Sequence, residues 1–255
     1  MSQSQAGSGQ VDAGGARSWR GLLVQPALVL AVFAGYLIWL FNADLSSSES
    51  RLLSWSQTQG LFLEHLRDTL IAAVIVVLIA VPLGIALTRG RMRRLSGPVI
   101  AVANVGQAAP AIGLIVLLAM WLGFGWPTAV VSLVAYTILP VLRNTMVGLN
   151  GVDPKLVEAG RGMGMSALAV LVRVELPLAV PVILAGVRTA LVLLVGTATL
   201  AAFINGGGLG ILIITGINLY LNSLLFSGAL LVALLALLVD WLGRVVEHVA
   251  RPRGL

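Results

Sequence analysis

The sequence contains no cysteine, one lysine and only 10% charged residues among its 255 positions. Without cysteine, disulfide bonds and thiolate metal sites are excluded. Because soluble domains carry about 25% charged residues, a chain this poor in charge cannot cover itself with a polar, water-exposed surface. The two histidines, His65 and His248, are far apart in the sequence and lie near the ends of apolar stretches. We interpret both as interfacial residues, so no metal site is predicted.

Apolar residues dominate the composition instead. They make up 58% of the chain, and the mean hydropathy is +1.00. Such a composition predicts that lipid replaces water around most of the protein, and the length favours one integral membrane domain. The net charge of +6 comes from fifteen arginines and one lysine, which alternate with apolar stretches. Because these cations form no single basic face, a nucleic-acid partner is not expected.

Several apolar stretches are long enough to cross a bilayer, whose hydrocarbon core of about 30 Å needs roughly 20 helical residues. The six predicted transmembrane helices are Leu22–Phe41, Thr69–Thr88, Pro98–Leu122, Pro127–Leu149, Leu178–Ile204 and Ser223–Gly243. The first stretch is too long for a typical signal-peptide core, so we expect it to remain as a membrane anchor. Residues 1–18 are rich in Ser, Gln and Gly and are predicted to be disordered.

The cations are unevenly divided between the two sides of the membrane. If the N-terminus is cytoplasmic, thirteen cations fall on the cytoplasmic side and two on the outer side. This positive-inside bias predicts that both termini are cytoplasmic. The cytoplasmic set is Arg17, Arg20, Arg89, Arg91, Arg93, Arg94, Arg143, Lys155, Arg161, Arg173, Arg244, Arg251 and Arg253, and the outer set is Arg51 and Arg67.

Three connections are then expected on the outer side. Residues 42–68 contain Gly60–Asp68, which is predicted to form an interfacial helix, and residues 123–126 form a tight turn. Residues 205–222 begin with a glycine-rich run and become apolar again at Ile211–Ile217. That apolar segment is too short to span the membrane, and we expect a re-entrant or gating element there.

The longest cytoplasmic loop, residues 150–176, is predicted to contain two short helices. Asp153 is a suitable N-cap and Pro154 a suitable first helical residue. Ser166 is expected to cap a second helix, Ala167–Val174, which Pro177 would stop. A flexible glycine run at 160–164 would act as a hinge that keeps the two helices close without side-chain clashes. A helix with an apolar face and one acidic residue, held outside the membrane, suits helix-in-groove binding.

The same loop resembles a signature of permeases from binding-protein-dependent ABC importers, which reads Glu-Ala-Ala, three residues, Gly, nine residues, then Ile-x-Leu-Pro. This chain has Glu158-Ala159-Gly160, then Gly164, then Val174-Glu175-Leu176-Pro177 at those spacings. It departs from the signature at Gly160 and Val174. The resemblance implies that the loop docks in a groove of a separate ATPase; the alternative is an interfacial hairpin with no partner. The implied coupling residues are Asp153, Glu158, Ala159, Gly160, Gly164, Val174, Leu176 and Pro177.

The resemblance also implies an all-α integral membrane protein of about six transmembrane helices, with the type I, MetI-like fold of ABC importer permeases. The implied layout is a cytoplasmic N-terminus at 1–18, a first transmembrane helix and outer loop at 19–59, a permease core at 60–248 and a cytoplasmic tail at 249–255. Implied partners are two ABC ATPase subunits, an extracytoplasmic binding protein and a second permease chain, identical or paralogous, in a bacterial cell membrane.

No ATPase activity is expected from the chain itself. A phosphate-binding loop needs Gly-x-x-x-x-Gly-Lys followed by Ser or Thr, and the single lysine, Lys155, lies between Pro154 and Leu156. ATP is therefore expected to bind to the partner subunit, and no cofactor is predicted for this chain. A stand-alone secondary transporter is the alternative class, but it would usually carry intramembrane carboxylates and an internal repeat. An intramembrane enzyme is disfavoured because the sequence lacks His-Glu-x-x-His.

Within this family the resemblance points to importers of osmoprotectants such as glycine betaine, choline, carnitine and proline, and it covers roughly residues 60–245. It rests on Tyr136–Leu149, on the loop motifs, and on segments from Leu184 to Gly210. Importers of methionine, sulfonates or other amino acids form the alternative.

Polar residues within the spans are candidates for the translocation pathway, with interhelical hydrogen bonding as the alternative. The candidates are Asn104, Gln107, Pro110, Asn144, Thr197 and Thr199. Asn104 and Gln107 are three residues apart and share a helix face, and Pro110 is placed to kink that helix. Arg188 is the most deeply placed charge, and we expect its side chain to extend toward the cytoplasmic interface.

Overall fold

The computed structural model describes the backbone of residues 19–250 and the side chains of residues 23–250. The predictions made for residues 1–18 and 251–255 lie outside this range. Within it, the chain is almost entirely helical and contains no strand. The elements are α1 (Trp19–Asn42), α2 (Ser47–Leu52), α3 (Trp55–Leu87), η1 (Gly90–Leu95), α4 (Ser96–Ala108), α5 (Ala111–Leu122), α6 (Trp126–Asn150), α7 (Pro154–Gly162), α8 (Ala167–Val170), η2 (Leu171–Glu175), α9 (Leu176–Ala198), η3 (Thr199–Ile204), α10 (Gly210–Asn218) and α11 (Asn222–Ala250).

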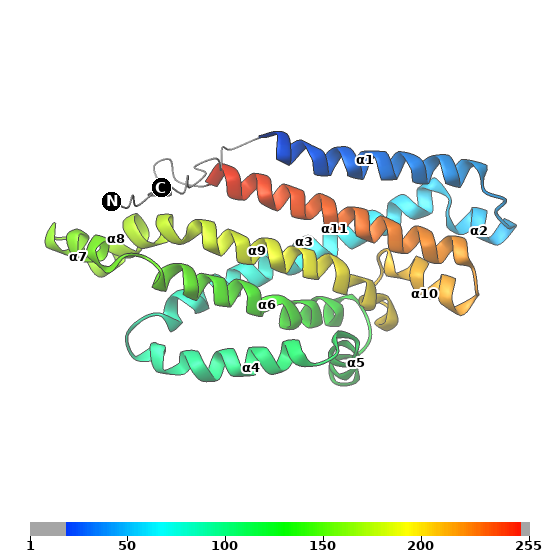
Figure 1. Cartoon of the computed structure of the whole chain (residues 1–255). Helices are drawn as coiled ribbons and strands as arrows, with labels where there is room; N and C mark the ends of the chain where they lie inside the picture. The colour runs from blue at the N-terminus through cyan, green and yellow to red at the C-terminus, as the bar shows by residue number, and fades with distance from the viewer. Residues whose placement is uncertain (1–18, 251–255) are drawn as a thin grey trace, which may run out of the picture.

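Long helices running along one axis form the body of the molecule (Figure 1). Among the described residues, five helical stretches are long and apolar enough to cross a membrane, and a sixth is added if the bent pair Gly90–Ala108 and Ala111–Leu122 counts as one span. This agrees with the all-α architecture of about six transmembrane helices expected from the sequence.

The centre of the bundle is packed through small residues on α3, α6 and α9. A Cβ atom at Gly186 on α9 would lie 2.6 Å from the Asn144 Cβ and 2.9 Å from the Pro140 carbonyl oxygen, both on α6. A Cβ atom at Gly84 on α3 would lie 2.7 Å from the Thr145 side chain. Glycines at these contacts let the helix backbones approach closely, which is how membrane helices gain packing energy in lipid.

The first helix packs on the outside of this bundle. α1 lies along α11 (Figure 1), and Trp39 meets Phe226 edge to face with ring centroids 5.1 Å apart. Much of the remaining surface of α1 is exposed and apolar, with Phe41 83% exposed. An exposed apolar surface on a long helix is what contact with lipid requires.

The span predicted as Pro98–Leu122 is not one straight helix. α4 and α5 are bent by 101° at the break between them, and α5 runs across the direction of α4 just beyond its end (Figure 1). Pro110 has no backbone N–H for a helix, and Ala109 before it has the extended φ of −65° and ψ of 144° that a following proline favours. A kink was predicted here, but a full change of direction was not.

Two predictions for the outer side are also corrected. Gly60–Asp68 is not a separate interfacial helix, because it is continuous with the span in the 33-residue α3. No proline or turn sequence interrupts the residues between Trp55 and Val81, so nothing ends the helix there. His65 is not interfacial either, since it is only 1% exposed and its Nε2 lies 3.0 Å from the Val195 carbonyl oxygen. The glycine-rich loop covers it at Gly208.

The apolar segment after the glycine-rich loop forms the nine-residue helix α10. It is too short to cross a bilayer, as predicted, and it packs against α11. A Cβ atom at Gly216 would lie 2.5 Å from the Leu225 backbone nitrogen, so this glycine is what allows the two helices to touch. Its gating role stays a prediction.

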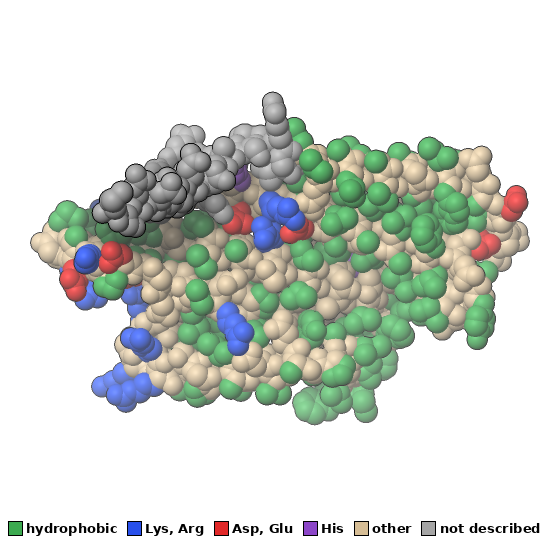
Figure 2. Space-filling model, in the orientation of Figure 1, with side chains coloured by type: hydrophobic (Ala, Val, Ile, Leu, Met, Phe, Trp, Pro, Cys, Tyr) green, Lys and Arg blue, Asp and Glu red, His purple; other side chains and the backbone are tan. Residues whose placement is uncertain are grey.

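The described part of the chain begins and ends at the same end of the bundle. α1 starts and α11 finishes at the end that carries α7 (Figure 1). Lys and Arg side chains gather toward this end, while the other half of the visible face is largely hydrophobic (Figure 2). Most of the described cations therefore lie toward one end of the bundle, and Arg51 and Arg67 lie toward the other.

Candidate functional site

The loop that carries the signature protrudes from the basic end of the bundle as α7 and α8 (Figure 1). Both helix starts were predicted correctly. The Asp153 carboxylate accepts a hydrogen bond from the Lys155 backbone N–H at 2.9 Å, with Pro154 as the first helical residue. The Ser166 hydroxyl accepts one from the Ala169 N–H at 3.2 Å. Short polar side chains satisfy the free N–H groups at both helix starts.

The glycine run between the two helices is a hydrogen-bonded cap and not a flexible hinge. The Met165 N–H donates to the Gly160 carbonyl at 3.1 Å, and the Gly164 N–H donates to the Arg161 carbonyl at 2.9 Å. This pair of bonds is a Schellman motif, which needs a left-handed residue just after the helix. Gly164 has φ +80°, and a Cβ atom there would meet nothing within 4 Å. Gly164 is therefore needed for its backbone angle and not to prevent crowding.

Close contact between the helices occurs at Gly160 instead. This residue is buried, and a Cβ atom on it would lie 3.3 Å from the Val170 Cγ2 and 3.7 Å from the Val174 Cγ2. The alanine that the family signature has at this position would need Val170 to move by a few tenths of an ångström. α7 thus rests directly on the helical turn that contains Val170 and Val174.

The second helix does not stop before Pro177, contrary to the prediction. α8 continues through the π-helical turn Leu171–Glu175 into α9, so the loop helix and the span form one continuous helical stretch from Ala167 to Ile204. In a regular α-helix the Pro177 ring would clash with the carbonyl of Arg173, four residues earlier. The wider π turn lies at this place, and such turns often mark functional positions.

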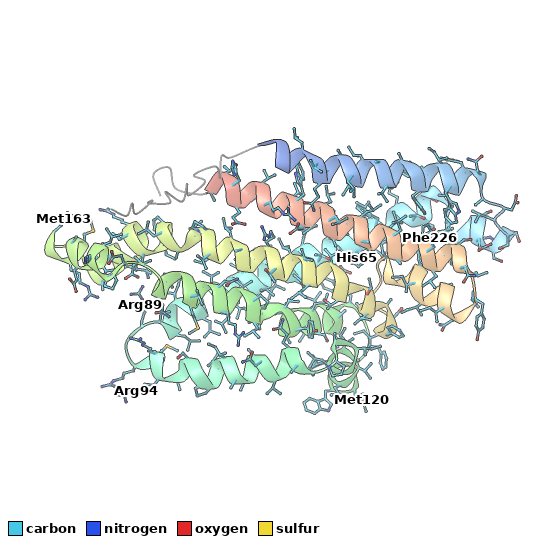
Figure 3. The ribbon with its side chains drawn as sticks, in the orientation of Figure 1. His65, Arg89, Arg94, Met120, Met163 and Phe226 are labelled. Carbon is cyan, nitrogen blue, oxygen red and sulfur yellow. The ribbon has the colours of Figure 1, made fainter. Side chains whose placement is uncertain are left out.

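The outer surface of the loop combines apolar side chains with charged ones, among them Lys155, Glu158 and Arg161. Glu158 and Ala159 are exposed, and Met163, 71% exposed, lies at the tip (Figure 3). Of the other implied coupling residues, Pro177 is exposed, whereas Val174 and Leu176 are half-buried against the loop and the bundle. The exposed apolar side chains on this surface are Leu156, Met163, Leu168 and Val172. Such a surface at the end of the bundle suits a protein partner.

The predicted pathway residues do not form one cluster. Asn104 accepts a hydrogen bond from the Arg143 Nη2 at 3.0 Å, which joins α4 to α6. Gln107 is half-buried on the same helix, and Pro110 lies at the break before α5. Asn144 faces Gly186 in the contact between α6 and α9. No continuous polar path through one chain follows from these positions.

The two threonines bond to their own helical stretch, not across to another helix. The Thr197 hydroxyl donates to the Leu193 carbonyl at 2.8 Å, and the Thr199 hydroxyl donates to the Gly196 carbonyl at 2.7 Å. Neither hydroxyl donates to another helix of this chain, and the role of both threonines in the pathway stays a prediction. Back-bonding of this kind is common for hydroxyl side chains within helices.

Arg188 is paired and does not simply extend toward the interface as predicted. Its Nη1 lies 3.0 Å from the Glu247 Oε2 and its Nε lies 3.4 Å from the Asp240 Oδ1, both on α11. Asp240 also bonds Arg244 at 2.6 Å and accepts from the Gln25 side chain on α1 at 3.3 Å. This network ties α1, α9 and α11 together in the basic half of the bundle. The sequence could have indicated acidic partners for Arg188, because Asp240 and Glu247 are two helical turns apart on one face of α11.

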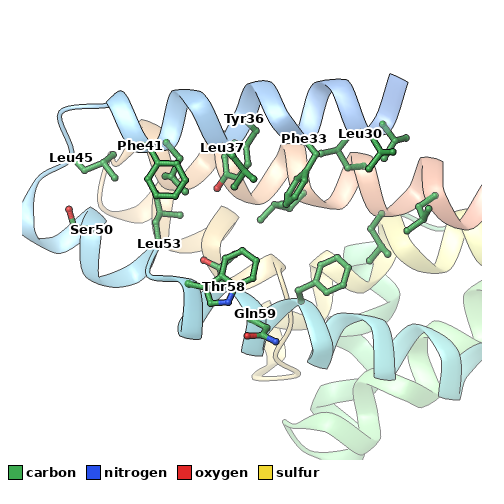
Figure 4. A pocket seen from close by; sticks show the side chains of 18 of the residues that line it. Leu30, Phe33, Tyr36, Leu37, Phe41, Leu45, Ser50, Leu53, Thr58 and Gln59 are labelled. Carbon is green, nitrogen blue, oxygen red and sulfur yellow. The ribbon is translucent and has the colours of Figure 1, made fainter. Parts of the chain in front are cut away.

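A groove of about 620 Å³ opens between α1 and α3, with α11 behind it (Figure 4). Ser50, Thr58 and Gln59 line part of it, and most of the other lining side chains are aliphatic or aromatic, including Phe33 and Leu37. A water-soluble solute would lose its hydration there and gain few hydrogen bonds in return. We therefore do not assign this groove to the transport pathway.

A helical membrane-spanning bundle with a capped, signature-bearing loop at its basic end defines the class of ABC import permeases. Residues 80–251 match the family described as the binding-protein-dependent transport system inner membrane component, and the chain belongs to this family. It is accordingly the membrane-spanning permease subunit of an ATP-driven importer.

Curated relatives and solved structures agree with this family. The chain is 42% identical over 211 residues to the glycine betaine/carnitine/choline transport system permease protein OpuCB of Bacillus subtilis, covering 81% of this chain and 96% of that protein. It is 44% identical over 192 residues to the choline transport system permease protein OpuBB of Bacillus subtilis, covering 75% and 88%. The inward-facing MetNI methionine ABC transporter has a chain with the same fold, at a TM-score of 0.70 and 22% identity over 82% of this chain and all of that one.

Proposed function

We propose that this permease carries a small osmoprotectant of the glycine betaine, choline, carnitine or proline type, handed over by an extracytoplasmic binding protein. The observation that carries this proposal is the identity of 42% and 44% to relatives named for glycine betaine, carnitine and choline. A permease for another small solute, such as an amino acid or a sulfonate, is the competing assignment. The methionine transporter supports it only at the level of the fold, since the identity there is 22%.

The loop around Glu158 is proposed to dock in a groove of a separate ABC ATPase, which binds and hydrolyses the ATP. Its exposed apolar side chains, together with the exposed Glu158 on α7, support this role, because a helix that presents apolar anchors fits helix-in-groove recognition. Two ATPase copies and a second permease chain complete the proposed assembly. The grouping of cations at the end that carries α7 supports a cytoplasmic position for that end and for both termini.

Transport then follows alternating access. ATP binding closes the two ATPase subunits and moves the two docking loops, which reorients the paired helical bundles. ATP and the loaded binding protein must each favour one state of the permease, since a ligand with equal affinity for both states shifts nothing.

Uptake of labelled betaine, choline, carnitine and proline by a deletion strain, with and without this chain, tests the substrate class. Uptake of none of them, together with uptake of methionine or a sulfonate, would reject the assignment. The purified chain alone is expected to be inert in liposomes under ATP or an ion gradient. Gradient-driven uptake by the chain alone would favour a secondary transporter instead.

The docking role is tested by Glu158→Lys, with Asp44→Lys as the matched control. Both replace an exposed acid, but Asp44 lies at the opposite end of α1 from the docking loop. Reversing the charge of a docked contact should abolish co-purification of the ATPase for Glu158→Lys only. Equal retention of the ATPase by both variants would show that the loop is not the docking element.

A further inference from the structure

A buried acid lies directly beneath the docking loop. Glu175 ends the π-helical turn and is only 4% exposed. It occupies the position between Val174 and Leu176 that the family signature leaves open to any residue. Its carboxylate meets the guanidinium of Arg89, which follows the end of α3 and lies 86 residues earlier in the chain. The signature therefore does not account for this acid.

The contact between the two side chains is bidentate. The Arg89 Nη1 donates to the Glu175 Oε1 at 3.1 Å, and the Arg89 Nη2 donates to the other carboxylate oxygen. Two parallel bonds fix the orientation of both groups as well as their separation. The Arg89 side chain is 40% exposed and the Glu175 side chain 6%, so removing Arg89 would leave a buried carboxylate unpaired, which is strongly unfavourable. The pair therefore holds the start of α9 against the end of α3.

The docking loop also acts on this pair electrostatically. Burial lowers the pKa of the Arg89 guanidinium, and the positive charge of Arg161 on α7 lowers it further. The guanidinium nevertheless stays protonated, as arginine does in proteins. Arg161 thus repels the same cation that holds Glu175, so a displacement of α7 changes the electrostatic environment of the pair.

Direct packing joins the loop to the pair as well. Gly160 on α7 rests against Val170 and Val174, and Glu175 is the next residue along the chain. Contacts therefore run without a gap from α7 to the π turn, and from the π turn through the bidentate pair to Arg89 and the end of α3. Figure 3 shows Arg89 below the loop, near the end of the bundle.

α3 can carry such a movement across the molecule. It has 33 residues, which corresponds to a length of about 50 Å. Toward its other end, the Glu64 carboxylate accepts a hydrogen bond from the Gly208 N–H at 3.3 Å, in the glycine-rich loop before α10. One helix thus connects the side beneath the docking loop with the loop at the opposite end of the bundle.

We propose that Arg89 and Glu175 are positioning residues that transmit movement of the docking loop to α3 and, through α3, to the glycine-rich loop at the other end. The proposal rests on the docking role proposed above for the same loop. In this proposal the ion pair couples ATP hydrolysis to transport, and attachment of the ATPase depends on the exposed surface of α7.

The test uses the full complex of permease, ATPase and binding protein in proteoliposomes, and it measures solute transported per ATP hydrolysed. The variants are Arg89→Gln, Glu175→Gln and the charge exchange Arg89→Glu with Glu175→Arg. Each single variant should keep the ATPase bound but lower the transport ratio by about 2- to 30-fold, the range found for residues that modulate coupling. The exchange should recover the ratio, because it restores the pair. Arg91→Gln, an exposed neighbour, is the control and should keep the wild-type ratio.

Three outcomes would overturn the proposal. Single variants with the wild-type ratio would show that the pair transmits nothing. An exchange variant as low as the single variants would show that the pair itself is not what matters. Loss of the bound ATPase in the single variants would assign the pair to docking or folding. Glu158→Lys in the same assay separates the two proposals, because retention of the ATPase by that variant rejects the docking role whatever the ratio measurements show.

Discussion

Replacing Gly164 by alanine tests whether the shape of the docking loop depends on one backbone angle. Gly164 has φ +80° with open space around its missing Cβ, so alanine causes strain and no clash. A left-handed conformation costs an L-residue roughly 1–2 kcal/mol. If the ATPase binds only the capped loop, that cost lowers its affinity by about 5- to 30-fold. Gly164→Asn should lose less, because asparagine tolerates this conformation better.

Gly162 provides the matched control two residues away. A Cβ atom at Gly162 also meets nothing within 4 Å, but this residue is inside α7 and its φ is not positive. Gly162→Ala should leave the affinity unchanged or raise it slightly, because alanine favours helix by about 1 kcal/mol over glycine. Titration of the purified ATPase against permease variants in nanodiscs measures the effect. Equal affinities for Gly164→Ala and Gly162→Ala would refute the argument from the backbone angle.

Three further predictions concern the bundle and the loop that contains α2. Gly186→Ala should overpack the contact between α6 and α9 at a cost of about 1–3 kcal/mol, which lowers the apparent Tm by several degrees. Gly196→Ala is the control on the same helix and should not lower the Tm, because the space around Gly196 is open. Arg188→Ala should lower the stability of the folded permease by about 1–3 kcal/mol, between the values for exposed and buried ion pairs. A Tm as high as that of the unaltered chain would contradict the pairing of Arg188 with the acids on α11. The pKa of Glu49 is held below its usual value of 4.5, first by the Ser46 backbone N–H, so the cap of α2 contributes stability above pH 4.5 and loses it as the pH falls through the lowered pKa. Hydrogen exchange of residues 47–52 across this pH range, with Glu49→Gln as a pH-insensitive reference, measures that loss.

Local sequence signals identified much of this protein because they depend on neighbouring residues. The apolar stretches predicted the spans, since about 20 apolar residues in a row have few alternatives to crossing a membrane. Asp153 and Ser166 marked helix starts correctly, because capping involves residues only two or three positions apart. Pro110 marked a break, but a missing N–H does not determine an angle, and the change of direction by 101° depends on what α5 packs against.

The sequence alone determined the membrane environment, the helical class, the family and the place of the signature-bearing loop. Only the tertiary structure decided which charges meet and what each glycine does. Glu175 meets Arg89 across 86 residues, and Arg188 meets Glu247 across 59. Such pairs follow from how helices dock, which no local pattern encodes. Gly160 and Gly164 look alike in the sequence, but one allows a close contact and the other a left-handed angle, because packing and backbone conformation are set by the folded chain as a whole.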